Sequence, residues 1–80
     1  PGRPRMPFTA RQLRTALGRA GFLELRQHGS HLILRRHERD GRIRRLTIPI
    51  HHGDVKAGTL EDILREAGMT EDDLRRLLRG

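Results

Sequence analysis

Residues 28–50 read HGSHLILRRHERDGRIRRLTIPI, and they hold the clearest pattern of secondary structure in the chain. Two runs rich in leucine and isoleucine flank Asp40-Gly41. An Asp-Gly pair between two such runs is a strong hairpin signal, because both positions tolerate a positive φ angle. Pro49 limits the second run, since proline has no N–H to donate to a ladder. The stretch therefore predicts two antiparallel strands, at about 31–38 and 43–49.

A further strand is expected upstream of this hairpin. Leu23 and Leu25 alternate with Glu24 and Arg26, which predicts a strand with one buried face. The turn His28-Gly29-Ser30 then interrupts the pattern. Three strands in a row, joined by short turns, predict an antiparallel meander.

Helices are predicted on both sides of the meander. Thr9 with Gln12 is a capping-box pattern that starts a helix over 10–20, and Thr70 with Asp73 repeats the pattern for a short helix over 71–78. Thr59 is the expected N-cap of another helix, with two acids in its first turn. Glycines stop the first two helices, and apolar stripes lie along all three: Leu13, Ala16, Leu17, Ala20; Leu60, Ile63, Leu64, Ala67; Leu74, Leu77, Leu78.

These elements define an α+β fold of order α-β-β-β-α, with a three-stranded antiparallel sheet, helices on one face and a short C-terminal helix. With 80 residues the chain forms one domain, and such a domain buries only about 60% of its unfolded surface. Any site must therefore lie on an open face. Residues 1–5 (PGRPR) carry no apolar pattern and precede Met6, so they are interpreted as a cloning remnant, and 6–80 as the domain.

Charge narrows the class of partner. Seventeen basic and ten acidic residues give a net charge of +7, and ten of the basic residues but three of the acidic ones lie in residues 11–45. Such asymmetry favours a nucleic acid over a membrane, because the arginines do not share one amphipathic helix with bulky apolar residues. The chain has no cysteine, no apolar run of membrane length and no signal-peptide pattern, so a cytoplasmic location is expected.

Histidine supplies the candidate chemistry. Gly29-Ser30-His31 is a tight polar turn followed by an apolar run, which would hold the imidazole of His31 at the mouth of an anchored strand. Histidine acts as acid or base near neutral pH, and RNA cleavage needs a base, an acid and cations near the phosphate. The expected phosphate-binding residues are on the hairpin and beside the His51 loop: Arg35, Arg36, Arg39, Arg42, Arg44, Arg45 and Lys56.

Two other interpretations of these residues are weaker. The histidines lack the spacing of a zinc site, and His51 and His52 are adjacent and would diverge, so neither a metal nor another cofactor is expected. Ser30 as a nucleophile lacks an orienting acid and fits a turn or a phosphate contact better. The sequence has two phenylalanines and no other aromatic residue, which argues against a base-stacking platform.

The sequence resembles the HicA family of toxins, also called YcfA-like mRNA interferases. Three ordered elements carry the resemblance, which runs from Met6 to about Leu78: Gly29-Ser30-His31; Thr47-Ile48-Pro49-Ile50-His51-His52-Gly53; and Lys56-Ala57-Gly58-Thr59-Leu60 with Ile63-Leu64-Arg65-Glu66-Ala67-Gly68-Met69. Two departures from the family pattern are the arginine-rich hairpin and the extra His52.

The resemblance implies a fold like that of double-stranded-RNA-binding domains and ribosome-independent cleavage of messenger RNA by the toxin of a type II toxin–antitoxin pair. It implies that His31 is the catalytic residue and that Gly29 shapes the turn presenting it, while His51 supports the site. It also implies a HicB-type antitoxin as partner, with the toxin monomeric when free and heteromeric when neutralised.

Two rival functions use the same features. A non-catalytic binder of double-stranded RNA or DNA would be expected to carry lysine at a helix N-terminus, whereas Leu60-Glu61-Asp62 opens the expected second helix with acids. A protein-interaction module would instead use the basic surface to bind an acidic partner. Cleavage of RNA distinguishes the nuclease from both.

Overall fold

A computed structural model describes residues 8–80, and residues 1–5, interpreted above as a cloning remnant, lie outside the described residues. The elements follow the predicted order: α1 (Ala10–Arg19), β1 (Leu23–His28), β2 (His31–His37), β3 (Ile43–Pro49), α2 (Ala57–Ala67) and α3 (Glu71–Arg79). The strands form one antiparallel sheet of order β1-β2-β3. The predicted fold class is thus confirmed.

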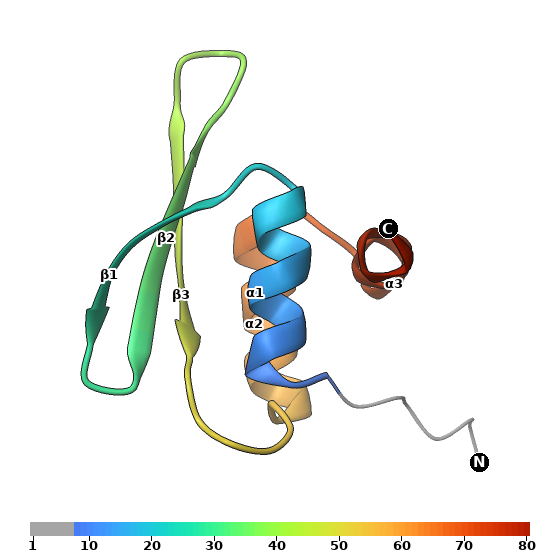
Figure 1. Ribbon diagram of the computed structural model, residues 1–80. Coiled ribbons are helices and arrows are strands. Elements are labelled where there is room, and N and C mark those ends of the chain that lie inside the picture. The colour runs from blue at the N-terminus through green and yellow to red at the C-terminus, as the bar shows by residue number, and fades with distance from the viewer. Residues whose placement is uncertain (1–7) are drawn as a thin grey trace.

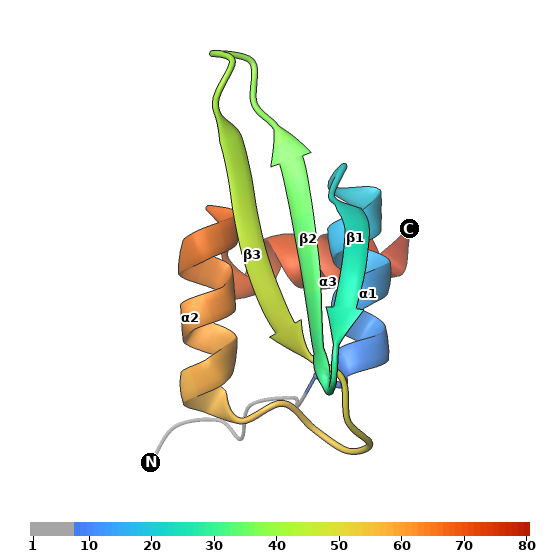
Figure 2. The ribbon, with the colours of Figure 1, turned by 90° about the vertical axis from the view of Figure 1, so that its left-hand side faces the viewer.

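The molecule is layered. α1 and α2 cover one face of the sheet, and α3 lies on the side of α1 away from the strands (Figure 1). Figure 2 shows α2 beside β3 and the opposite face of the sheet open, with no helix over it. We call the covered side the inner face and the open side the outer face. Function that needs access to the strands must use the outer face or the ends of the sheet.

The core lies between the inner face and the helices. Leu32 and Leu34 of β2 and Leu46 and Ile48 of β3 are buried there. They pack against the predicted stripes of α1 and α2 and against Leu74 of α3, whereas Ala20, Leu77 and Leu78 are partly buried at its margin. Each strand alternates, so the residues between these point to the outer face. That alternation determines which side every arginine of the hairpin occupies.

The helix starts are confirmed for α1 and α3. The Thr9 hydroxyl accepts from the N–H of Gln12 at 3.1 Å, and the Gln12 side chain accepts from the N–H of Thr9 at 2.9 Å. Thr70 and Asp73 make the same reciprocal pair. These contacts satisfy backbone donors that the first turn of a helix leaves free.

The Asp40-Gly41 hairpin is confirmed, with a different turn from the one that two positive φ angles would make. The N–H of Gly41 donates to the carbonyl of Glu38 at 3.1 Å, and that of Glu38 donates to the carbonyl of Arg42 at 2.8 Å. Gly41 has φ +88°, whereas Asp40 does not enter the positive region. The loop is therefore a β-turn followed by one residue of positive φ, a common three-residue hairpin loop.

The prediction that Leu23 and Leu25 form a buried face of β1 was wrong. Both are exposed, at 61% and 40%. Glu24 pairs with Leu34 and so points to the inner face, where Arg14 of α1 binds its carboxylate at 2.8 and 2.9 Å. The register then shifts between Glu24 and Arg26. An ion pair therefore fills the inner side of this edge strand, and its leucines face outward.

The prediction that Thr59 caps α2 was also wrong. The helix begins at Ala57 with Lys56 as N-cap, and Thr59 lies inside its first turn. The N–H of Leu60 already donates to the carbonyl of Lys56 at 2.8 Å. Glu61 and Asp62 consequently fall beyond the first turn. The predicted stop at Gly68, which is left-handed with φ +68°, is confirmed.

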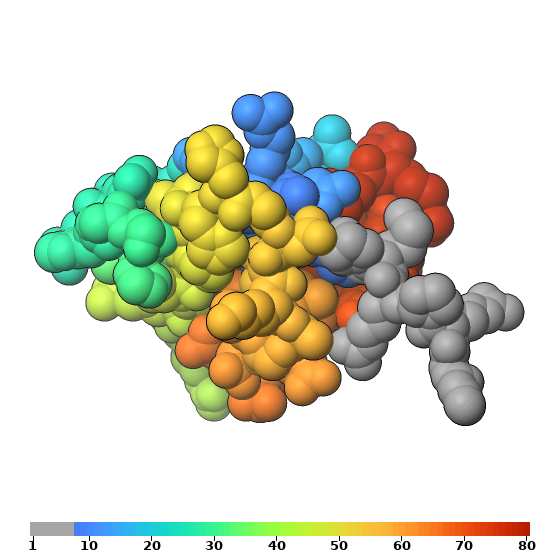
Figure 3. Space-filling view, turned by 90° about the horizontal axis from the view of Figure 1, so that it is seen from below, coloured from blue at the N-terminus to red at the C-terminus, as the bar shows by residue number. Residues whose placement is uncertain are grey.

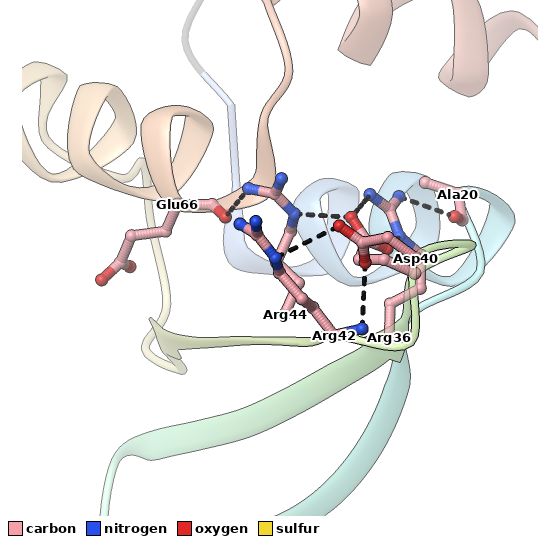
Figure 4. A network of polar contacts seen from close by, with 7 residues as sticks. Ala20, Arg36, Asp40, Arg42, Arg44 and Glu66 are labelled. Atoms are coloured by element: carbon pink, nitrogen blue, oxygen red, sulfur yellow. Dashed lines mark hydrogen bonds and ion pairs between the residues drawn. The ribbon is translucent and has the colours of Figure 1, made fainter.

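A cluster of ion pairs joins the hairpin to both helices (Figure 4). The Glu38 carboxylate accepts from Arg36 at 2.7 and 3.0 Å and from Arg44 at 2.8 Å. Arg36 also donates to the carbonyl of Ala20 at the end of α1, and Arg44 to that of Glu66 near the end of α2. These two carbonyls lie at helix C-termini, where cations are favourable. The hairpin is thus tied to α1 and α2 at the end remote from the Gly29 turn.

Candidate functional site

The turn between β1 and β2 presents His31. His28 and His31 pair across it, so the loop is only Gly29-Ser30. Gly29 has a positive φ of +58°, whereas the φ of Ser30 is not positive. This is the pattern of a two-residue hairpin turn that favours glycine at its first position. Gln27 donates its side-chain amide to the carbonyl of Gly29 at 2.9 Å. His31 consequently stands on a short, braced turn as the first residue of β2.

The same turn is bound to the loop that carries His51. The N–H of Ile50 donates to the carbonyl of Ser30 at 2.6 Å. Further along, the N–H of Val55 donates to the carbonyl of Phe8, next to a β-bridge between Thr9 and Asp54. The loop therefore spans from the strand end to the start of α1.

These connections bring three of the predicted site residues together. His31, His51 and Lys56 line one open hollow of about 490 Å³, together with Thr59, Asp62 and Glu66 of α2. We call it the histidine hollow. Sequence spacing gave no sign that two carboxylates of α2 would share it, because that depends on α2 lying beside the edge of β3.

The ring of His51 is oriented by the backbone. Its Nδ1 lies 3.1 Å from the carbonyl oxygen of His52. A carbonyl only accepts, so Nδ1 carries the proton and donates. In the neutral ring Nε2 is then the unprotonated nitrogen. His51 can therefore take up or release a proton through Nε2 while its other nitrogen holds the loop.

Positive charge at the histidine hollow comes from the start of α2. Lys56 is the N-cap of α2, and its side chain makes no capping bond to the first N–H groups of the helix. A helix N-terminus carries a partial positive charge. The helix therefore opens with Lys56 and not with the acids on which the sequence argument against a nucleic-acid binder rested, while Asp62 lines the same hollow one turn further on.

The predicted phosphate-binding arginines are divided between the two faces of the sheet. Arg36 and Arg44 are on the inner side and are engaged with Glu38, and Arg36 also stacks on Phe22 with 4.5 Å to the ring centre. Arg42 is at the remote hairpin end, 3.2 Å from the Asp40 carboxylate. Arg35 is on the outer face, paired with Arg45 across the ladder. Among the residues predicted to bind phosphate, Lys56 lines the histidine hollow.

Two carboxylates of the sheet are held in their charged form by arginines, Glu38 at the hairpin end and Glu24 beside α1. Hydrogen bonds from Arg36 and Arg44 lower the pKa of Glu38 from 4.5 to about 2. Hydrogen bonds from Arg14 likewise lower the pKa of Glu24, and the same contact raises the pKa of Arg14. Both carboxylates therefore stay charged at neutral pH.

Two further hollows adjoin the histidine hollow. One lies on the outer face, where Thr47 borders both it and the histidine hollow, and it is lined by Leu25, Arg26, Ile33 and Arg45. The other lies between α1 and the loop, and His51 borders both it and the histidine hollow. Figure 3 looks onto this end, where the turn after β1 (green), the loop after β3 (yellow) and the start of α1 (blue) lie side by side.

Residues 8–80 show neither a metal-binding cluster nor a membrane-spanning helix. This part of the chain holds no group of three or more histidine, aspartate or glutamate side chains arranged to bind a metal ion. None of its helices is long and apolar enough to cross a membrane.

The fold and the site define a small basic α+β domain with an open hollow that holds two histidines and a lysine. The family model described as the HicA toxin of bacterial toxin–antitoxin systems matches residues 10–69, which include every element except α3. The chain therefore belongs to the HicA toxin family, and the predicted resemblance is confirmed. A search of curated proteins finds no matching sequence.

Proposed function

We propose that this HicA toxin is an endoribonuclease that cleaves messenger RNA, independently of the ribosome and of metal ions, with His31 as general acid or base. The observation that carries the proposal is the histidine hollow, in which two imidazoles and a lysine line one open surface. Few arrangements of ordinary side chains supply proton transfer and phosphate binding together. RNA carries its own nucleophile, the 2′-hydroxyl, so no further reactive group is needed.

The chemistry needs two proton transfers. One imidazole removes the proton from the 2′-hydroxyl, whose oxygen attacks the adjacent phosphorus. The other gives a proton to the departing 5′-oxygen, which leaves a 2′,3′-cyclic phosphate and a free 5′-hydroxyl. We assign these transfers to His31 and His51, because the free Nε2 of His51 can take part while Nδ1 is held by His52.

Negative charge on the phosphorus centre is stabilised by Lys56 and the start of α2. Arg35, with Arg45 opposite it, extends positive charge along the outer face toward the histidine hollow. Gly29 and Ser30 support the site by shaping the turn. Phosphate contacts by Arg42 stay a prediction, while Arg36 and Arg44 already bind Glu38 and helix carbonyls.

The proposed protein partner is a HicB-type antitoxin, which would neutralise a toxin that is monomeric when free and acts in the cytoplasm. Three large apolar side chains are exposed within residues 8–80, namely Leu23, Leu25 and Ile43, and they belong to the strands. Leu23 and Ile43 pair with Arg35 and His37 on the outer face. Exposed apolar groups beside arginines suit a protein surface with acidic and apolar residues.

The decisive test compares unmodified protein with His31→Ala on a long RNA in the presence of EDTA. We expect cleavage by the unmodified protein and a loss of at least 100-fold in the variant. Replacing ribose by 2′-deoxyribose at the cleaved position should abolish cleavage and leave binding. Equal cleavage by both proteins would reject the role of His31, and loss of activity in EDTA alone would indicate a metal-dependent route.

A non-catalytic binder of double-stranded RNA or DNA is the second candidate. Lys56 at the start of α2 favours it, because a lysine there is placed for backbone phosphates. This candidate predicts salt-dependent binding of a duplex with no product formed on long incubation. The same binding with turnover supports the nuclease.

A further inference from the structure

The hollow between α1 and the loop after β3 has a role that the proposed reaction leaves open. It has a volume of about 520 Å³ and is lined by Ala10, Arg11, Arg14 and Thr15 of α1 and by Ile50, His51 and His52. We call it the α1 hollow. Because His51 lines both this hollow and the histidine hollow, a ligand can extend from one into the other without leaving the surface.

The α1 hollow is positively charged. Arg11 and Arg14 are one turn apart on the exposed side of α1, and no carboxylate lines the hollow. Arg14 binds Glu24 through two hydrogen bonds, so part of its charge is already balanced. Arg11 makes no hydrogen bond or ion pair with any residue in 8–80, and its guanidinium is available to an anion.

The two hollows differ in the charge of the side chains that line them. Asp62 and Glu66 line the histidine hollow beside Lys56, and carboxylates repel a phosphate. The α1 hollow has arginine and imidazole instead. A polyanion bound across both hollows is therefore attracted more strongly in the α1 hollow than in the histidine hollow.

We propose that the α1 hollow is a phosphate subsite for RNA, in which Arg11 and His52 bind the phosphate next to the one cleaved between His31 and His51. This inference rests on the proposed nuclease function. The ligand is the RNA strand that is cleaved, because the path from the outer face through both hollows follows the end of the sheet and passes the shared His51 wall. An acidic protein surface is the competing occupant.

The test measures RNA binding by the His31→Ala protein, so that substrate survives, and compares Arg11→Gln with Arg79→Gln as the matched control. Arg79 is the last residue of α3, and Arg79→Gln removes the same charge as Arg11→Gln. We expect Arg11→Gln to weaken binding of a labelled single-stranded RNA about three- to tenfold near physiological salt. The slope of log affinity against log salt should fall by about 0.7, as for one lost phosphate contact on a single strand.

A second variant tests the site by gain of charge. Thr15→Arg places a further cation on the wall of the α1 hollow, and it should tighten RNA binding by a similar factor. In protein with His31 intact, Arg11→Gln should raise KM for RNA with kcat unchanged, because it removes binding shared by ground and transition states.

The outcomes separate the two proposals. If the unmodified protein cleaves RNA while Arg11→Gln and Arg79→Gln bind it equally, the subsite is rejected and the nuclease stands. If Arg11→Gln weakens an acidic protein partner and leaves RNA affinity unchanged, the hollow belongs to that partner and the subsite is again rejected. Failure of the unmodified protein to bind or cleave RNA rejects both.

Discussion

The proposed reaction gives the two ring nitrogens of His51 separate tasks. Asparagine reproduces the Nδ1 donor of histidine but lacks Nε2, so His51→Asn keeps the bond to the carbonyl of His52 and removes the proton-transfer atom. We expect kcat for RNA cleavage to fall by about 10²- to 10⁴-fold, with loss of one limb of the pH–rate profile. Steady-state kinetics over pH 5–9 would measure both.

A purely supporting role for His51 makes a different prediction. If His51 only holds the loop, His51→Asn should cleave RNA at the unmodified rate with an unchanged pH profile. His51→Ala, which also breaks the loop contact, would then lose activity and thermal stability together. The comparison of the two variants therefore separates chemistry from loop structure.

Gly29 is the residue on which the position of His31 depends. A Cβ at Gly29 meets no atom within 4 Å, so the strain of Gly29→Ala is conformational, from the φ of +58°. We expect destabilisation of about 1–2 kcal/mol by chemical denaturation. RNA cleavage should fall as well, because His31 is the second residue after Gly29 and follows the turn directly.

Gly18 provides the matched control for that substitution. It lies within α1, a Cβ there also meets open space, and its φ is not positive. Gly18→Ala should stabilise the protein by about 0.5–1 kcal/mol, because alanine loses less entropy in a helix. Similar effects of the two substitutions would contradict the strain argument.

At this scale sequence predicts a residue well when the reason is local. The capping boxes of Thr9 and Thr70 depend on contacts three residues away, and both are present. His31 at a strand mouth follows from Gly29 in the same way. The proposed role of Arg11 has no local signal in the sequence, because an arginine on the exposed side of a helix looks the same whether or not the loop after β3 lies beside it.

Among the elements, the β2–β3 hairpin depends on Glu38. The pKa of Glu38 is lowered from 4.5 to about 2 by Arg36 and Arg44. A carboxyl whose pKa is lower in the folded state contributes stability above pH 4.5, and this contribution is lost as the pH falls toward 2. We therefore expect the thermal midpoint to fall between about pH 5 and pH 2, and Glu38→Gln to show a smaller fall.

The control for that experiment is an exposed carboxyl outside the cluster. Asp72 of α3 is 85% exposed in its side chain, so Asp72→Asn should retain the acid-induced fall of the unmodified protein. Part of the fall should persist in Glu38→Gln, since Glu24 and Asp73 also have lowered pKa values. An identical pH dependence in Glu38→Gln and unmodified protein would show that Glu38 does not hold the hairpin.

The elements also show where sequence patterns are insufficient. Alternation of Leu23 and Leu25 correctly predicted a strand, but which face is buried depends on the register against β2 and on the pairing of Glu24 with Arg14. The start of α2 was misplaced because Thr59 is a good cap by residue type. The backbone instead begins the helix at Ala57, without any side-chain cap.

In the molecule as a whole, the two ends of the sheet differ in structure. The hairpin end is held to the helices by Glu38 and its arginines, whereas the Gly29 end carries the three adjoining hollows. The sequence shows that one half of the chain is basic, but it does not show which face of the sheet each arginine occupies. The same strand alternation directs Arg36 and Arg44 inward and Arg35 and Arg45 outward. Of these four arginines, the outward pair lies on the open face, where Arg26 and Arg45 line the hollow that adjoins the histidine hollow.

The outward pair leads to a prediction in which stability and function move in opposite directions. Arg35 and Arg45 are cross-strand partners, and like charges directly opposite each other destabilise a sheet. Arg45→Glu turns the repulsion into an attraction, so we expect the free energy of unfolding to rise by about 0.2–1 kcal/mol. The same change should weaken RNA binding in the His31→Ala protein about tenfold or more, because the sheet loses a cation and gains an anion next to the RNA path.

Arg79→Glu makes the same change in net charge on α3, away from the sheet, and should alter RNA affinity far less. If both variants weaken binding equally, the attraction is a property of net charge and the outer face is not part of the path. If Arg45→Glu gains stability and keeps its RNA affinity, the outer arginines serve another partner. A gain in stability with a loss of RNA binding specific to Arg45 would mean that the sheet retains an unfavourable charge pair because RNA binds there.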